Sequence, residues 1–291
     1  MEEYESPLIE KFLFRIAKKW IAGDTMAEAL KSAIQANKNG MGAIINRLGE
    51  HSTSKAQVDK TVLEYLTLVS KLSKYKVSGG ISVKPTQVGL ARGFGECLNN
   101  FGIIAEEASQ YNSFVWIDME SSEYTDDTIK VYLSLFEKYE RLALAIQANL
   151  KRTESDLETL LDKGAKIRLV KGAYRENKST AYKTRHEVDE NYKKLTQMLF
   201  IKGNEFGIAT HDAKLIDLAI NLSEIHQKKF EFQMLKGIRD ELKPVLIKSG
   251  FSVSEYIPYG TNWLPYSIRR LKERKRNILL LGSSFLHSHR V

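Results

Sequence analysis

The chain has 291 residues, of which 43% are hydrophobic, so it is long enough to bury one large core and to form a single α/β barrel. Its net charge of +8 comes from 44 basic and 36 acidic residues spread along the sequence, which permits nucleic-acid binding without requiring it. The single cysteine, Cys97, excludes an internal disulfide, and no apolar run approaches the roughly 20 residues of a membrane-spanning helix. The acidic start MEEYESPL lacks the basic-then-apolar pattern of a secretory signal, so we expect a cytoplasmic protein.

Residues 1–40 precede the first strand-like segment and are predicted to form an N-terminal helical extension to a main domain at residues 41–291. In the main domain, short β-rich runs alternate with amphipathic segments that are typical of helices. Eight β-rich runs occur: GAIIN, GISVK, FVWID, LALAIQ, AKIRLV, FGIATH, FEFQM and FSVSEY. Eight alternations favour an α/β fold of the (β/α)8 type, in which the carboxyl ends of all strands meet at one mouth.

The segment TESDLETLLDKG shows the helical pattern between two of these runs. Thr153 is predicted to cap the helix, and Gly164 is predicted to end it. The leucines between them recur at a spacing that places them on one face.

Polar residues lie at the carboxyl ends of the predicted strands. In chain order they are Asn46, Lys84, Asp118, Gln147, Arg168, His211, Gln233 and Tyr256. Any one of them could mark a strand returning to solvent, but so many polar groups converging on one mouth need partners. The set therefore predicts a ligand site.

The segment YIPYGTNWLPYSIRRLKERKRN follows the eighth strand, and Pro265 suits the first turn of a helix there. Its polar residues Tyr266, Arg269, Arg270 and Glu273 fall within an arc of about 100°, while Leu264, Ile268 and Leu271 lie on the opposite face, which we expect to pack. A basic helix face is often simply solvated. At the barrel mouth, however, paired guanidiniums suit a carboxylate ligand.

Several motifs together resemble the FAD-dependent proline dehydrogenases, specifically their monofunctional form. They are INRLGE, IDME, IRLVKGAYRE, IATHD, FEFQMLKG and the segment after the eighth strand, and they extend over residues 41–277. The resemblance implies a distorted (β/α)8 barrel that is TIM-like and holds FAD at the strand ends. It also implies oxidation of L-proline to Δ1-pyrroline-5-carboxylate, by hydride transfer from proline C5 to flavin N5, as the first step of proline catabolism.

The resemblance further implies roles for individual residues, and no metal site. The catalytic residues would be Lys84, Asp118 and Arg168. The substrate would contact Lys84, Leu235, Tyr256, Tyr266, Arg269 and Arg270, with the two arginines clamping its carboxylate. The cofactor would contact Met119, Gln147, Arg168, Val170, Lys171, Gly172, Ala173, Tyr174, Thr210, His211 and Glu273. The chain departs from the family pattern at Asn46, where an aspartate is usual, and at Arg175, where a tryptophan is common.

Two other functions stay open on the residues alone. One is a class I aldolase-like barrel, in which Lys84 or Lys171 forms a Schiff base. The other is a basic protein that binds nucleic acid through the last helix. The resemblance implies instead no nucleic-acid partner, a quinone or other electron acceptor, transient contact with the inner face of the cell membrane, and a pyrroline-5-carboxylate dehydrogenase that takes the product.

Overall fold

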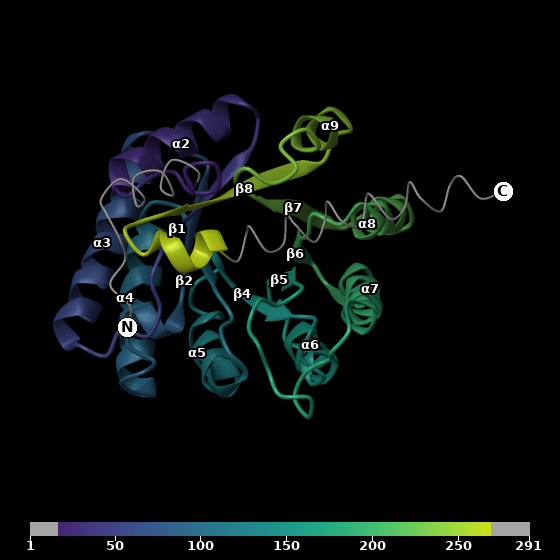
Figure 1. Cartoon of the computed structure of the whole chain (residues 1–291), viewed down its shortest axis with the longest axis horizontal. Coiled ribbons are helices and arrows are strands. Elements are labelled where there is room, and N and C mark those ends of the chain that lie inside the picture. The colour runs from purple at the N-terminus through teal and green to yellow at the C-terminus, as the bar shows by residue number, and fades with distance from the viewer. Residues whose placement is uncertain (1–16, 269–291) are drawn as a thin grey trace.

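The computed structural model describes residues 17–268, which contain a closed barrel of eight parallel strands in sequential order (Figure 1). The strands are β1 (Gly42–Arg47), β2 (Gly79–Val83), β3 (Phe114–Ile117), β4 (Leu142–Gln147), β5 (Ile167–Val170), β6 (Glu205–Ala209), β7 (Lys229–Leu235) and β8 (Ser252–Tyr259). All eight predicted runs form strands, and the predicted (β/α)8 barrel is confirmed.

Helices follow the strands around the outside of the barrel, and α2 precedes the first strand (Figure 1). They are α2 (Met26–Lys38), α3 (Lys55–Lys74), α4 (Phe94–Gln110), α5 (Thr125–Leu135), α6 (Thr153–Asp162), α7 (Arg185–Lys202), α8 (Ala213–Ile225) and α9 (Lys243–Lys248), with short 3₁₀ turns η1 (Pro85–Val88) and η2 (Ser122–Tyr124). Among the described residues, none of these helices combines the length and the apolar character that crossing a bilayer requires. The buried face of α2 belongs to the main core, and a domain boundary at residue 40 stays a prediction.

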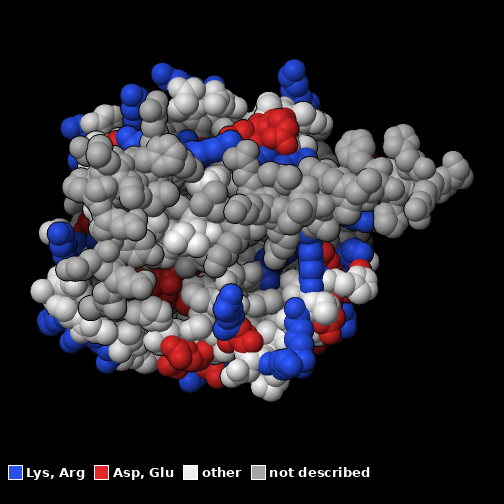
Figure 2. All heavy atoms as spheres, viewed as in Figure 1, with Lys and Arg blue, Asp and Glu red and all other residues white. Residues whose placement is uncertain are grey.

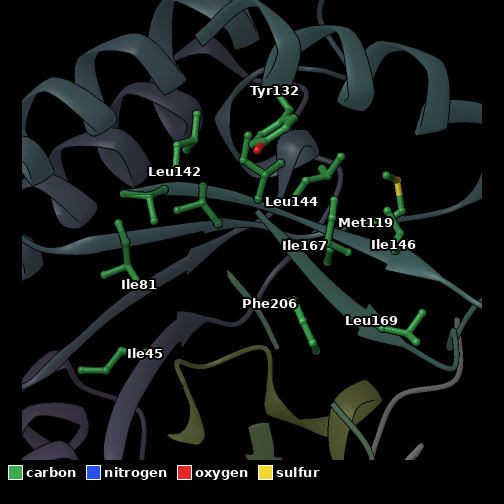
Figure 3. Packing of buried hydrophobic residues seen from close by; sticks show 14 of the residues in the cluster. Ile45, Ile81, Met119, Tyr132, Leu142, Leu144, Ile146, Ile167, Leu169 and Phe206 are labelled. Atoms are coloured by element: carbon green, nitrogen blue, oxygen red, sulfur yellow. The ribbon is translucent and has the colours of Figure 1, made fainter. Parts of the chain in front are cut away.

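The main core lies between the outer faces of the strands and the helices. Alternate residues of a strand point to opposite sides, so Leu144 and Ile167 on neighbouring strands face outward together. Figure 3 shows them beside Tyr132 of α5, whose hydroxyl accepts a hydrogen bond of 2.9 Å from the backbone N–H of Lys166. Strands buried on both faces read as continuous apolar runs, which is why the sequence predicted them well.

The α6 helix begins differently from the prediction. Thr153 is its first residue and makes no cap; its hydroxyl instead donates a 2.5 Å hydrogen bond to the carbonyl oxygen of Gln147 at the end of β4. Thr153 is buried, so its hydroxyl had to find a partner within the protein. The end of the helix matches the prediction, because Gly164 follows it with φ at +77°.

Residues 263–268 are helical and begin the helix that was expected after β8, with Pro265 in its first turn. The prediction of the packed face was wrong at Ile268, which is 41% exposed, whereas Trp263 and Tyr266 are buried. The two aromatic residues pack with Trp20 in a small cluster of their own, and Leu264 of the predicted face packs against that cluster while Ile268 does not. Arg269, Arg270, Leu271 and Glu273 lie outside the described residues.

A buried lysine, Lys243, is hydrogen-bonded to the end of β7. The Lys243 side chain at the start of α9 is 2% exposed, and its Nζ lies 2.6 Å from carboxylate oxygens of both Glu255 and Asp240. The same ammonium donates a 3.0 Å hydrogen bond to the carbonyl oxygen of Leu235, the last residue of β7. The interaction therefore holds a strand end that lies at the barrel mouth.

We predict that Lys243→Met lowers the free energy of unfolding by about 3 kcal/mol, because it leaves the buried Glu255 carboxylate with only the more distant Lys236, at 3.8 Å, as a counter-charge. Urea denaturation measures the loss. Lys248→Met is the matched control, since Lys248 is an exposed lysine on the same helix. Equal stability of the two variants would contradict the assigned role.

Candidate active site

The carboxylate of Asp118, directly after β3, is the centre of a buried cluster. The Lys84 ammonium lies 2.8 Å from Oδ2, and the Tyr256 hydroxyl donates to the same oxygen at 2.9 Å. The Ser82 hydroxyl donates to Oδ1 at 2.7 Å, and the Arg168 guanidinium forms an ion pair with that oxygen. These groups come from four strands, so closure of the barrel is what brings them together.

The charges of this cluster stabilise one another. Burial alone would raise the pKa of Asp118, but the charges of Lys84 and Arg168 hold that pKa well below its usual value. Burial alone would lower the pKa of Lys84, but the Asp118 carboxylate raises it above its usual value. Both groups therefore stay ionised at neutral pH, and Lys84 acts as a fixed cation.

The guanidinium of Arg168 is only 3% exposed and lies between aromatic rings and polar groups. Its central carbon is 5.0 Å from the ring centroid of Trp116 and 5.6 Å from that of Tyr256. One Nη2 hydrogen bond, 3.0 Å long, goes to the Ser82 hydroxyl. Its Nε has no hydrogen-bond partner within the described part of the chain, which leaves a buried donor for a ligand to satisfy.

Near the ends of β4 and β5, two further buried polar atoms have no hydrogen-bond partner among residues 17–268. Gln147 donates through Nε2 to the carbonyl oxygen of Glu120 at 2.5 Å, but its Oε1 makes no hydrogen bond with any described residue. The same holds for Oδ1 of Asn149. That oxygen lies over Gly172, where a Cβ would approach it to 2.0 Å and where φ is +100°. Only glycine fits there, so the backbone after β5 passes unusually close to this polar wall.

The other residues expected to contact the cofactor are distributed around the same strand ends. Lys171 pairs with the carboxylates of Asp189 and Asp212, the latter at 3.1 Å. The Thr210 hydroxyl accepts a 3.2 Å hydrogen bond from the backbone N–H of Asp212. His211 accepts one of 2.9 Å at Nε2 from the backbone N–H of Leu235. These contacts connect the ends of β5, β6 and β7.

The remaining predicted residues differ in burial. Met119 is buried, Val170 and Tyr174 are half-buried, and Ala173 is exposed. The Tyr174 hydroxyl donates to Oε1 of Glu50 at 3.1 Å, which ties the loop after β5 to the loop after β1. Glu273, with Arg269 and Arg270, lies outside the described residues, so the cofactor and clamp roles of these three stay predictions.

The two departures from the family pattern have different surroundings. Asn46 is buried and donates through Nδ2 to the carbonyl oxygen of Ser82 at 2.9 Å, so a neutral amide supports the strand that carries Lys84. Arg175 is exposed on the loop after β5, and nothing in the structure explains it.

Several site residues were not identified from the sequence. Ser82 and Trp116 contact the charged cluster, and Asn149 supplies one of the buried polar atoms. Ser82 lies two residues before Lys84, and Trp116 lies two before Asp118. Because residues two apart share a face of a strand, this spacing was a signal that could have identified both.

The sequence matches the model of a family described as proline dehydrogenase over residues 29–280. Proline dehydrogenase 1 of Bacillus subtilis is 33% identical over 264 residues, which cover 90% of this chain and 87% of that protein. The proline dehydrogenase of Deinococcus radiodurans is 30% identical over 294 residues, covering 97% and 95% of the two chains.

Among solved structures, proline utilization A from Bdellovibrio bacteriovorus, inactivated by N-propargylglycine, superposes with a TM-score of 0.82 at 24% identity. The match covers 91% of this chain and 33% of that one, so this chain spans about a third of that larger protein and shares its barrel fold. With the family model and two relatives at 30% identity or more agreeing over nearly the whole sequence, the chain belongs to the proline dehydrogenase family.

Proposed function

We propose that the protein oxidises L-proline to Δ1-pyrroline-5-carboxylate with FAD as its cofactor, the first step of proline catabolism. The observation that supports this best is the buried charged cluster of Lys84, Asp118 and Arg168 at the barrel mouth. Close to it are polar atoms that the described residues leave without partners. Such a combination of fixed charges and unsatisfied groups is typical of a site that a bound molecule completes.

The residues at the strand ends fit a flavin. Arg168 offers a buried donor at Nε, Gln147 and Asn149 offer buried acceptors, and Gly172 lets the backbone approach closely. When bound, FAD supplies the acceptor for the hydride. The buried charge of Arg168 would favour negative charge accumulating on that acceptor, because a preorganised cation in a dry site needs no rearrangement during the reaction.

The substrate would lie at the same barrel mouth as the flavin, against the charged cluster of Lys84, Asp118 and Arg168. Leu235 is at the mouth end of β7 and half-buried, and Tyr266 is buried in the first turns of the helix after β8. We propose that Leu235 contacts the proline ring, that Tyr266 and Tyr256 wall the site, and that Arg269 and Arg270 clamp the carboxylate. Holding the ring in one orientation places its C5 hydrogen for transfer.

The charge of Lys84 has a specific chemical use. A protonated secondary amine has no lone pair with which to expel a hydride from C5, so proline must be neutral at nitrogen when transfer occurs. A nearby cation lowers the pKa of the bound amine, and Asp118 opposes this in part. Because the pKa of Lys84 is raised by Asp118, the lysine stays a cation under the conditions in which proline must lose its proton.

Neither alternative function fits the structure as well. A Schiff base needs a neutral amine, whereas Lys84 is held as an ammonium ion and Lys171 pairs with two carboxylates. Nucleic acid needs a basic surface, whereas the described residues on the face drawn in Figure 2 have acidic and basic side chains interspersed.

We propose that the electrons taken from proline pass to a quinone or another acceptor. The protein would reach this acceptor by transient contact with the inner face of the cell membrane. The cyclic imine product can hydrolyse to a semialdehyde. An aldehyde-oxidising enzyme, a pyrroline-5-carboxylate dehydrogenase, would then consume it.

The first test is an absorption spectrum. The purified protein should show flavin bands in the blue, and anaerobic addition of L-proline should bleach them, because hydride transfer reduces the flavin. Alanine, a primary amine without the ring, should leave the spectrum unchanged. A flavin-free protein that binds DNA with steep salt dependence, or one trapped by borohydride on a carbonyl substrate, would overturn the proposal.

The second test uses pH. The rate of anaerobic flavin bleaching at subsaturating proline should rise from neutral to mildly alkaline pH, as the bound amine loses its proton. Lys84→Met should move this rise to higher pH by about one unit, since it removes a cation that disfavours the protonated amine. Asp118→Asn should move it the opposite way. Stopped-flow spectroscopy measures each profile.

Lys214→Met, an exposed lysine on α8, is the matched control for this series and should keep the wild-type profile. A flat wild-type profile would exclude the neutral-amine mechanism. A shift in the control as large as that of Lys84→Met would show that net charge, rather than position, is responsible.

A further inference from the structure

A hydrogen-bonded chain leads from Arg168 deeper into the barrel and ends at an unexplained carboxyl group. Nη1 of Arg168 donates to Oε1 of Gln233 at 3.4 Å, and Nε2 of Gln233 donates to Oε1 of Glu231 at 2.6 Å. The other carboxyl oxygen of Glu231 accepts a 2.5 Å hydrogen bond from the Ser254 hydroxyl. None of the steps proposed above uses Glu231.

The barrel reserves space for this chain. Glu231 and Gln233 are two residues apart on β7, so their side chains share the inner face of the strand, while Phe232 between them packs outward. At Gly207 on β6, a Cβ would come within 2.7 Å of Nε2 of Gln233. At Gly42 on β1, it would come within 2.5 Å of the Ser254 hydroxyl. A side chain at either glycine would displace the hydrogen-bonded residues Gln233 or Ser254.

The carboxyl group of Glu231 fixes the direction of the Gln233 amide. An amide can present either its oxygen or its nitrogen, but only the nitrogen can donate to Glu231. The amide oxygen must therefore point to Arg168. The 3.4 Å contact is long for a hydrogen bond, so it acts mainly as a dipole whose negative end faces the guanidinium.

The charges inside the barrel also balance through Glu231. Lys84 and Arg168 are cations and Asp118 is one anion, so the negative charge of an ionised Glu231 brings this inner set to neutrality. Among the charged groups of the described residues, Arg168 of β5 and Glu205 of β6 act most strongly on Glu231. Burial raises the pKa of Glu231, and the hydrogen bonds from Ser254 and Gln233 oppose that rise.

We propose that Glu231 is a positioning residue for flavin reduction, acting through Gln233 to weaken the positive field of Arg168 at the flavin. This inference rests on the proposed function. Arg168 favours the reduced, anionic flavin, and a guanidinium opposed by the Asp118 carboxylate alone would hold electrons too tightly to release them to an acceptor. Glu231 would thus keep the flavin's reduction potential low enough for turnover.

The test is the midpoint potential of the bound flavin in Glu231→Gln, a variant of nearly the same shape without the charge. We expect the reduced flavin to be favoured by about tenfold more than in the wild type, a rise of about 30 mV for two electrons. A merely structural role gives the opposite sign, because a loosened Arg168 would stabilise the reduced flavin less. An unchanged or lowered potential therefore overturns the proposal.

Glu205→Gln is the matched control. It removes the same charge from the neighbouring strand, where Glu205 pairs with Lys166 and Lys229 instead of with the amide. Its potential should stay within a small fraction of the Glu231→Gln shift. An equal shift would show that the effect is long-range charge alone and would remove the role of the amide.

A second variant keeps the proposal testable if Glu231→Gln does not fold. Gln233→Met breaks the chain while leaving the carboxyl group in place, and it should raise the potential by less than the carboxyl substitution does. Where both variants fold, their shifts in midpoint potential should be less than additive in the double variant, because both act through the same series of hydrogen bonds. Full additivity, or a lowered potential in Gln233→Met, would contradict the proposal.

The outcomes also separate this inference from the proposed function. A wild-type protein without flavin, or with flavin that proline does not bleach, refutes the function itself. A wild-type protein that proline bleaches normally, with an unmoved potential in Glu231→Gln, refutes only the role of Glu231.

Discussion

The ionised carboxylate of Asp118, held between Lys84 and Arg168, is the interaction on which the site depends. Three charges are buried together, and none could stay buried alone, because an isolated ion loses far more hydration energy than the interior returns. The partners come from different strands, so the cluster exists only when the barrel is closed. Formation of the charged cluster therefore requires closure of the barrel, which couples the geometry of the site to the stability of the fold.

The sequence predicted the barrel because parallel strands buried on both faces give short apolar runs at regular intervals. It also placed Lys84, Asp118, Arg168 and Tyr256 at one mouth, since the carboxyl ends of parallel strands converge. It did not predict Ser82 or Trp116, because a serine or tryptophan inside an apolar run looks like ordinary strand composition. Their importance appears only once the register sets them beside charges on neighbouring strands.

The errors at Thr153 and Ile268 have a common cause. Rules for caps and helix faces assume a helix in water, whereas both helices begin against the strand ends. There, the need to satisfy a buried hydroxyl or to cover an aromatic cluster outweighs local preference. The two faces of the barrel strands also differ in character. The outer faces form an apolar core, and the inner faces carry the polar groups that the chemistry uses.

The glycine at position 207 has an evolutionary consequence. Its missing side chain leaves the volume that the Gln233 amide occupies, so the two positions share one space. A larger residue at 207 would either push the end of the Gln233 side chain aside or favour a shorter residue at 233, and both changes would disconnect Glu231. Relatives that keep the connection are therefore expected to keep glycine at position 207.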